Sequence, residues 1–207
     1  MATGRTEAFS DGVFAVAITL LILNVLVPEV RDGQLYAALL KRWPVYTSYA
    51  VSFLTIGIIW VNHHTMFSYI EKVDRMLLFL NLAFLMTVVF IPFPTALLGA
   101  YIVTPENSHV AAVVYSGTMT AMGLTFAAMW IYVGGHKDLL NETFDPVAAR
   151  KSAPRFGAGT FIYGASIAVA FVSAYICLII YALLALFYVF DQLSDTGQSK
   201  KDGEPAS

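Results

Sequence analysis

The stretch Arg5-Thr-Glu-Ala-Phe9-Ser10-Asp11-Gly12-Val13-Phe14 runs directly into an apolar segment that ends at Pro28. No charged residue occurs between Gly12 and Val27, so we predict a helix over 7–27 that crosses a bilayer, which requires about 20 residues. An aspartate within a membrane helix is costly, about 2.5–3.5 kcal/mol at mid-bilayer. Asp11 therefore indicates a position with polar partners or a function.

The composition extends this interpretation to the whole chain. Of its 207 residues, 58% are hydrophobic and 13% are charged, whereas soluble domains are about 45–50% apolar and about 25% charged. We therefore expect an all-α, polytopic membrane protein. The net charge of −2 gives no indication of a nucleic-acid partner, and the single cysteine, Cys177, excludes a disulfide within the chain. No cleavable signal peptide is expected, because Glu7 and Asp11 interrupt the apolar region that one requires.

Hydropathy and helix breakers divide the chain into six expected transmembrane helices. The first four cover 7–27, 44–69, 76–102 and 109–133, and Pro92-Phe93-Pro94 is expected to kink the third. The uncharged stretch 156–190 is too long for one upright span, so we divide it near Ser173 into two helices. Residues 1–190 then form the transmembrane domain, and residues 191–207 form a disordered cytoplasmic tail.

The distribution of Lys and Arg predicts the orientation. If the N-terminus is cytoplasmic, nine basic residues lie inside and three lie outside, namely Arg31, Lys41 and Arg42. Because cytoplasmic segments of membrane proteins are enriched in Lys and Arg, we expect both termini in the cytoplasm. The expected location is the cell membrane, with the lipid bilayer as surroundings.

The first helix has two distinct faces at 100° per residue. An aliphatic stripe lies on one face, with Thr19 at its edge: Gly12, Val16, Leu20, Leu23 and Val27. The opposite side carries these residues: Asp11, Phe14, Ile18 and Ile22. This separation suggests a pore-lining helix whose stripe faces a shared axis while Asp11 faces its own subunit. Ordinary packing or lipid contact is the alternative interpretation of the stripe.

Asp11 needs polar partners, because burying a polar group without hydrogen bonds is costly. The next two spans offer four candidates: Trp60, His63, His64 and Asn81. The first three share a helix face, and a second span that runs inward would bring them to the level of Asp11. We expect a structural hydrogen-bond cluster here. Arg5 is six residues from Asp11 and would pair with it across subunits or through an irregular first turn.

Three motifs resemble the transmembrane protein 175 family of potassium channels. Arg5-x-x-x-Phe9-Ser10-Asp11 is similar to the signature of its first helix, and Trp60-x-x-His63-His64 is similar to its second-helix motif. Asn81-Leu82 and Ile91-Pro92-Phe93-Pro94-Thr95 resemble its third-helix pattern. The motifs occur in the family's order and spacing, and the resemblance covers about residues 5–190, although the last three spans match only in hydropathy.

The resemblance implies a potassium-permeable cation channel with K⁺ as the permeant ion and no cofactor or bound metal. Bacterial single-repeat members are homotetramers whose first helices line the pore, and rings of aliphatic side chains form the constriction. Those rings would be Val16, Leu20 and Leu23, with Thr19 placed to ligate a partly dehydrated ion. Such rings gate by dewetting.

The resemblance also assigns a polar network that supports the pore helix. Its members here are Arg5, Ser10, Asp11, Trp60, His63, His64 and Asn81. Asn24 departs from the family pattern, because many bacterial relatives carry an acid there. The missing negative ring would weaken the attraction of cations near the outer mouth.

Two other function classes compete with a channel. A proton-coupled secondary transporter would use Asp11, His63 and His64 as a relay, but the chain has no internal repeat. A membrane enzyme would require a nucleophile or metal set that these spans do not supply. The adjacent histidines lack further metal ligands at suitable spacing, and adjacent helical side chains diverge by about 100°. We therefore expect a channel and not an enzyme.

Overall fold

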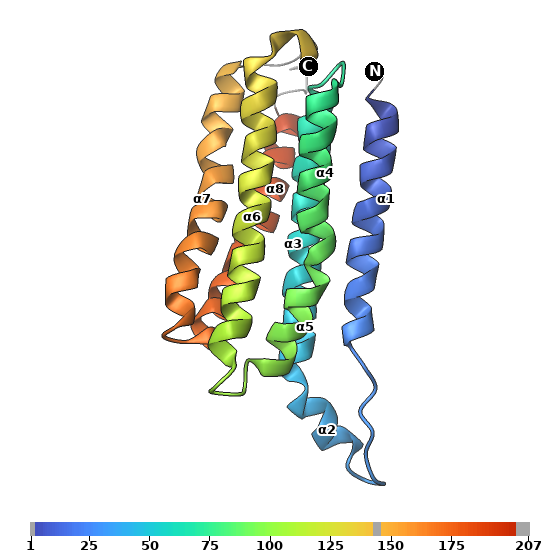
Figure 1. Cartoon of the computed structure of the whole chain (residues 1–207), viewed down its shortest axis with the longest axis vertical. Helices are drawn as coiled ribbons and strands as arrows, with labels where there is room; N and C mark the ends of the chain where they lie inside the picture. Colours follow the sequence, from blue (N-terminus) through green and yellow to red (C-terminus); the bar gives the residue numbers. More distant parts are fainter. Residues whose placement is uncertain (1–2, 143–145, 202–207) are drawn as a thin grey trace.

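The computed structural model describes residues 3–142 and 146–201, with side chains described for 3–142 and 157–190. The helices within these residues are α1 (Gly4–Leu20), η1 (Leu21–Asn24), α2 (Leu35–Lys41), α3 (Trp43–Ser68), α4 (Arg75–Phe90), α5 (Pro92–Tyr101), α6 (Ser108–Gly135), η2 (Lys137–Leu139), α7 (Pro146–Ala170) and α8 (Ala174–Lys201). The long helices run alternately up and down the bundle, so that α1 begins and α8 ends at the same end (Figure 1).

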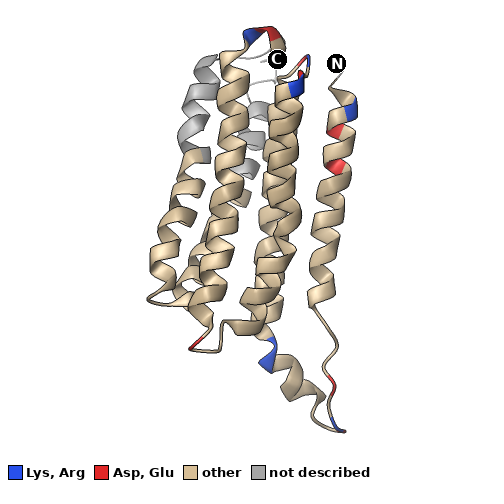
Figure 2. Ribbon diagram, in the orientation of Figure 1, with Lys and Arg blue, Asp and Glu red and all other residues tan. Residues whose placement is uncertain are grey.

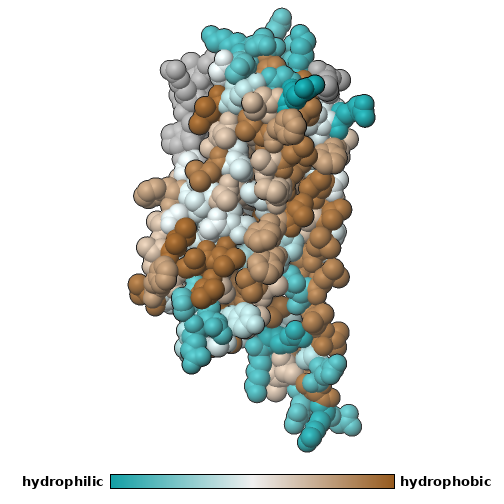
Figure 3. All heavy atoms as spheres, in the orientation of Figure 1, coloured by the Kyte–Doolittle hydropathy of each residue, from teal (hydrophilic) through white to brown (hydrophobic). Residues whose placement is uncertain are grey.

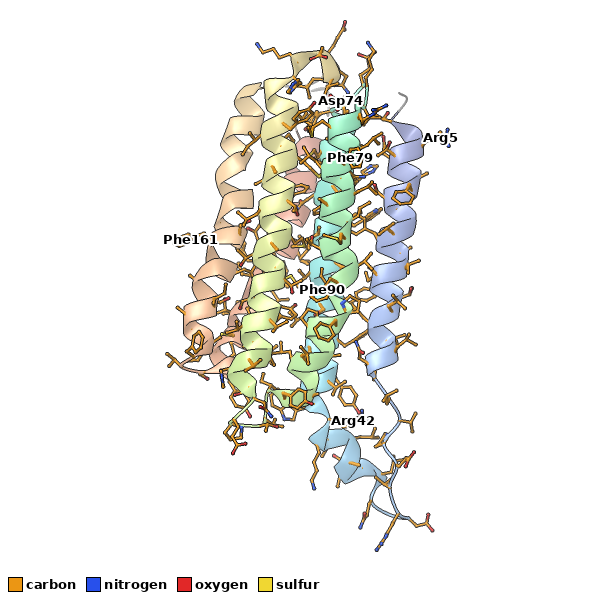
Figure 4. All side chains as sticks on the ribbon, viewed as in Figure 1. Arg5, Arg42, Asp74, Phe79, Phe90 and Phe161 are labelled. Atoms are coloured by element: carbon orange, nitrogen blue, oxygen red, sulfur yellow. The ribbon has the colours of Figure 1, made fainter. Side chains whose placement is uncertain are left out.

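The surface of the bundle has the polarity of a membrane protein. Charged residues gather at the two ends, and hydrophobic residues cover most of the length between them (Figure 2, Figure 3). Arg5 and Asp74 lie at one end and Arg42 lies at the other (Figure 4). The exposed rings of Phe79 and Phe161 lie between these ends, where lipid tails would surround them.

The prediction of six transmembrane helices is confirmed. Four helices are long and apolar enough to span a bilayer: Gly4–Asn24, Trp43–Ser68, Arg75–Tyr101 and Ser108–Gly135. Two shorter apolar helical segments complete the six, at Gly157–Ala170 and Ala174–Phe190. The predicted division near Ser173 falls in the turn between them.

Some boundaries differ from the predicted ones. Helical structure in the first span ends at Asn24, and the polar connection after it contains α2, which hydropathy did not indicate. Helix α8 continues to Lys201, beyond the residue where the disordered tail was expected to begin. The rest of that tail, residues 202–207, lies outside the described residues.

The predicted kink in the third span is a break between two helices. Helix α4 ends at Phe90 and α5 begins at Pro92, because Pro92 and Pro94 have no backbone N–H to continue the ladder. Beside the break, the hydroxyl of Thr95 adds a second bond to the carbonyl oxygen of Ile91, with its Oγ1 2.8 Å away; the backbone N–H of Thr95 donates to the same oxygen at 3.1 Å. Thr95 Oγ1 also lies 2.7 Å from Ser52 Oγ in α3, which fixes α5 against the second span.

Asp74 lies in the turn between α3 and α4 and joins that turn to α6. The hydroxyl of Tyr132 donates to one carboxylate oxygen, and the backbone N–H of Leu77 donates to the other at 2.8 Å. The second bond is an N-terminal helix cap. Both bonds favour the ionised carboxylate, so they hold the pKa of Asp74 below its ordinary value.

This pKa shift predicts a pH-dependent contribution to stability. Because the folded-state pKa is lowered, the contribution is complete above the unfolded-state pKa of about 3.9 and is lost as the pH falls through the lower folded value. Asp74→Ala should cost about 0.5–2 kcal/mol at pH 7, the usual value of a helix cap, and little below that window. Thermal unfolding in detergent at pH 7 and pH 2 measures the difference.

Asp74→Asn is the matched control, because asparagine also caps helices but does not titrate. It should retain most of the stability at pH 7 and remove this component of the acid dependence. Equal losses from Asp74→Ala at both pH values would contradict the role of the ionised carboxylate.

Candidate functional site

Helix α1 lies at one side of the bundle, against α3 and α4 (Figure 1). Its buried side chains recur at helical spacing and face these two neighbours: Thr6, Ser10, Phe14 and Ala17, followed by Leu21 in η1. The first half of this buried side contains the polar side chains of Thr6 and Ser10. Polar bonds therefore hold the start of α1, and apolar packing holds its end.

The other side of α1 carries the predicted aliphatic stripe. Val16 is 54% exposed and Leu23 is 64% exposed in the single chain, and Gly12, Thr19 and Leu20 are exposed as well. In the described part of the subunit, the large apolar side chains of this stripe are left exposed. Such exposure is expected if the stripe contacts other subunits or lipid. The predicted member Val27 lies beyond the end of η1, so it does not belong to the helical stripe.

Thr19 lies within this exposed stripe, and its hydroxyl bonds to its own helix. Its Oγ1 is 2.8 Å from the carbonyl oxygen of Ala15 and 2.9 Å from that of Val16. Because the proton points to these carbonyls, the lone pairs of the hydroxyl oxygen are directed away from them. An oxygen oriented in this way can coordinate a cation.

Asp11 lies at the edge between the two faces. Its Oδ1 accepts a hydrogen bond of 2.8 Å from Trp60 Nε1 of α3, so it does contact its own subunit. Both side chains remain exposed, however, and Asp11 is not part of the buried stripe. The helical wheel placed Asp11 and Ile22 opposite the aliphatic stripe together with Phe14; of these three only Phe14 is buried, and Ile22 is half exposed. The ring of His64 stacks on Trp60, with the two centroids 6.2 Å apart.

A second, buried set of polar side chains links α3, α4 and α1. His63 Nε2 lies 2.9 Å from Asn81 Oδ1, and Asn81 Nδ2 donates to Ser10 Oγ at 3.0 Å. Ser10 donates in turn to the carbonyl oxygen of Thr6 at 2.9 Å. Because the amide oxygen can only accept, His63 Nε2 carries a proton. The donors therefore run in one direction, from His63 to the backbone of α1.

Aromatic rings enclose His63 on its other sides. Its ring centroid is 4.5 Å from that of Phe67, 5.6 Å from that of Phe84 and 5.5 Å from that of Phe14. Phe14 and Phe84 also pack against each other, with centroids 6.1 Å apart. This buried set of polar side chains therefore lies among aromatic rings, where each of its hydrogen bonds is hard to replace.

The predicted network thus separates into two parts. His63, Asn81 and Ser10 form the buried chain, whereas Asp11, Trp60 and His64 form an exposed group beside it. Arg5 is exposed and, within the described part of this chain, makes no ion pair with Asp11. Pairing between subunits stays a prediction for Arg5.

Comparison with known proteins shows that this chain is similar to proteins named as potassium channels. A family profile described as the endosomal/lysosomal potassium channel TMEM175 matches residues 5–92. A potassium channel of Streptomyces collinus is 50% identical over 192 residues, which cover 92% of this chain and 93% of that protein. A potassium channel of Chamaesiphon minutus is 40% identical over 191 residues, which cover 90% and 93%. The chain belongs to the TMEM175 family.

A solved structure supports the same assignment for the fold. The crystal structure of a lysosomal potassium-selective channel TMEM175 homolog from Chamaesiphon minutus matches with a TM-score of 0.81 and 35% sequence identity. The match covers 91% of this chain and 97% of that chain. In this TMEM175 family member, the region that matches the family profile contains α1, both polar groups behind it and the start of α5.

The described side chains of this TMEM175 family member contain no group of three or more His, Cys, Asp or Glu residues that could hold a metal ion. His63 and His64 lie on different sides of α3, one buried among aromatic rings and one exposed. Adjacent helical residues diverge in this way, so the two imidazoles do not converge on one point.

Asn24 is a residue whose role the sequence did not indicate. It ends η1, it is partly buried, and its Nδ2 donates to the carbonyl oxygen of Pro92 at 3.2 Å. The amide therefore joins the end of the first span to the break between α4 and α5. The sequence suggested only that a charge was missing at this position, because the contact joins residues far apart in the chain.

Asn24→Asp should weaken this joint. A carboxylate cannot donate, and it would face the carbonyl oxygen of Pro92 with its own negative charge. We expect a loss of about 1–2 kcal/mol, in the range of a hydrogen bond removed with one partner left in place. The measurement is thermal unfolding of the purified protein in detergent.

Asn24→Gln is the control for Asn24→Asp, because it keeps the donor on a longer side chain. It should recover part of the stability. An Asn24→Asp variant as stable as the parent at pH 7 would mean that the bond to Pro92 contributes nothing to the fold.

Proposed function

We propose that this chain forms a potassium-permeable cation channel in which K⁺ flows passively through a pore lined by α1. The observation that carries the proposal is the exposed aliphatic stripe on α1. The opposite side of the same helix is held in the subunit by the buried hydrogen bond between Ser10 and Asn81. The potassium channels of Streptomyces collinus and Chamaesiphon minutus, which this chain resembles over most of its length, support the choice of ion.

The pore requires several subunits. One lining helix per chain cannot enclose a water path, so the proposal includes a homotetramer with four copies of α1 around a central axis. Val16, Leu20 and Leu23 would then form three successive apolar rings. The buried stripe at Ser10 and Phe14 turns each copy so that these rings face the axis.

The rings would act as both gate and constriction. A narrow apolar ring holds no continuous water until it widens, so it stops ions without any charged group. Selectivity would come from the cost of removing water from the ion at the rings. The oxygen of Thr19, directed away from the carbonyls of its own helix, would offset part of that cost for K⁺.

The distribution of basic residues supports a location and an orientation for the channel. We place the channel in the cell membrane with both termini in the cytoplasm, because the end that carries Arg5 and Asp74 also receives the more basic connections of the chain. The proposed function involves no cofactor and no catalytic step.

A proton-coupled transporter is the alternative, and the polar contacts do not favour it. No hydrogen bond joins His63 to Asp11 within the described residues, and the chain of donors from His63 ends on the carbonyl of Thr6. An amide such as Asn81 and a terminal backbone carbonyl do not pass protons onward. His64 contacts Trp60 by stacking, which also provides no route for a proton.

Single-channel recording tests the proposal directly. The purified protein, reconstituted in a planar bilayer with unequal KCl on the two sides, should give unitary openings whose reversal potential moves toward the K⁺ equilibrium potential. Saturable flux that depends on a proton gradient, without unitary openings, would favour the transporter. Native mass spectrometry of the same preparation should show four subunits, and a stable monomer would contradict the shared pore.

A further inference from the structure

A partly open cavity of about 90 Å³ lies between the helices of the subunit, away from the exposed stripe of α1. Helices α3, α4, α6, α7 and α8 all contribute to its wall. Apolar side chains form much of the lining, among them Ile59, Phe84, Met119, Met122, Phe126 and Ala185. Five lining side chains are polar, Thr55 and Tyr163 among them, but the surface that they expose to the cavity is small beside the apolar surface. About 10–15 Å³ of such space suffices for a water molecule, so this cavity has room for a ligand of several heavy atoms.

The chemistry of the wall selects an apolar ligand. Water in a cavity needs two to four polar partners, whereas cavities lined by Leu, Ile and Phe stay dry and bind small apolar molecules. Met119 and Met122 also lie near the middle of the 28-residue α6, hence near the centre of the bilayer. Hydrocarbon is concentrated at that depth, while ions and polar solutes are excluded.

One wall of the cavity is also part of the support of α1. Phe84 is fully buried, and its ring centroid is 5.4 Å from that of Phe126 on the cavity side. On its other side the same ring packs against Phe14 of α1 and against His63, with centroids 6.1 and 5.6 Å away. A ligand that displaces Phe84 would therefore displace α1, because closely packed interiors transmit such shifts.

We propose that this cavity is a binding site for a hydrocarbon chain, and that its occupancy alters ion flow through the contacts of Phe84 with α1. The second part rests on the proposed function, since it takes α1 as the pore helix. The hydrocarbon has two possible sources, an acyl chain of a membrane lipid or a free apolar molecule.

Photolabelling tests the site without reference to ion flow. The full-length protein in liposomes is irradiated with octanol that carries a diazirine on its chain, or with a phospholipid that carries the diazirine in one acyl chain. Mass spectrometry should find label on the cavity-lining side chains of α6, namely Met119, Met122 or Phe126. Labelling by the phospholipid identifies the bilayer as the source, and labelling by octanol alone identifies a free ligand.

Ala185→Leu provides the occupied-cavity variant, because Ala185 lines the cavity and its added side chain would fill part of the space. It should lose the label on Met119, Met122 and Phe126. Ala182→Leu is the matched control, since Ala182 lies on the same helix but does not line the cavity. If Ala185→Leu does not assemble, Ala185→Val makes the same test with a smaller side chain.

Label confined to outward-facing side chains such as Leu124 and Phe161, or label that Ala185→Leu leaves unchanged, would overturn the site. Potassium flux from the same liposomes tests the coupling: octanol should change the flux of the parent and of Ala182→Leu but not that of Ala185→Leu. Equal responses in all three would overturn the coupling through Phe84. Absence of flux from the parent would reject the proposed function, while the labelling result would still stand.

Discussion

Leu23→Ala should produce the largest change in ion flow, with higher conductance and a potassium-over-sodium permeability ratio closer to one. In the proposed tetramer, four leucine side chains are shortened at one level of the pore, so the ring becomes wider and easier to wet. If the difference between the free-energy barriers for Na⁺ and K⁺ falls by about 1.4 kcal/mol, the permeability ratio falls about tenfold. Bilayer recordings under bi-ionic conditions measure the ratio from the reversal potential.

Ile22→Ala is the matched control, because Ile22 is the neighbouring aliphatic residue in η1 and is also exposed, but it lies off the stripe. It should leave the permeability ratio unchanged. Val16→Ala and Leu20→Ala widen the other two proposed rings and should act in the same direction as Leu23→Ala. If none of the three stripe variants changes the ratio, the stripe does not form the constriction and another surface lines the pore.

The fold was predictable where a single segment determines its own structure. Apolar length indicated the spans, and Pro92 and Pro94 indicated the break between α4 and α5, because proline acts on the backbone beside it. The turn near Ser173 followed from length alone. In contrast, α2 is a seven-residue helix in a connection of mixed composition, where neither periodicity nor length distinguishes a helix from a loop.

The exposed face of α1 was predictable from the sequence, but the contacts behind it were not. The wheel identified the exposed stripe at Val16, Leu20 and Leu23, because helical periodicity separates faces. It did not reveal that Asp11 lies at an edge, since the packed direction of α1 depends on where α3 and α4 sit. Nor did it reveal the contact of Asn24 with Pro92, which only the tertiary structure brings together.

The structure also gives Asn81, in the motif of the third span, a more specific role than the sequence did. From sequence, Asn81 was one of several possible partners of Asp11. In the structure it bonds to His63 and Ser10 instead. Asn81 is the residue through which α4 takes part in this hydrogen-bonded set. An amide suits this position because it accepts from one neighbour and donates to the other, which neither a carboxylate nor an ammonium group does.

Asn81→Ala should therefore be the most damaging change to the fold among these variants. It leaves the Nε2–H of His63 buried without its acceptor, among the rings of Phe14, Phe67 and Phe84. An unsatisfied buried donor costs about 1–3 kcal/mol, and the cavity left by the shortened side chain adds to that loss. We expect a marked fall in the thermal unfolding temperature of the detergent-solubilised protein and a smaller oligomer peak in size-exclusion chromatography.

The double variant His63→Phe/Asn81→Leu separates an unsatisfied donor from a simple loss of packing. Replacing both partners with apolar groups of similar shape removes the orphaned N–H, and such pairs are often close to neutral. Ser10 still donates to the carbonyl of Thr6, so the change leaves no buried donor behind. The double variant should be more stable than Asn81→Ala. If instead it is equally unstable, the polar chain is not what holds α1 in place, and packing of the aromatic rings must carry that role.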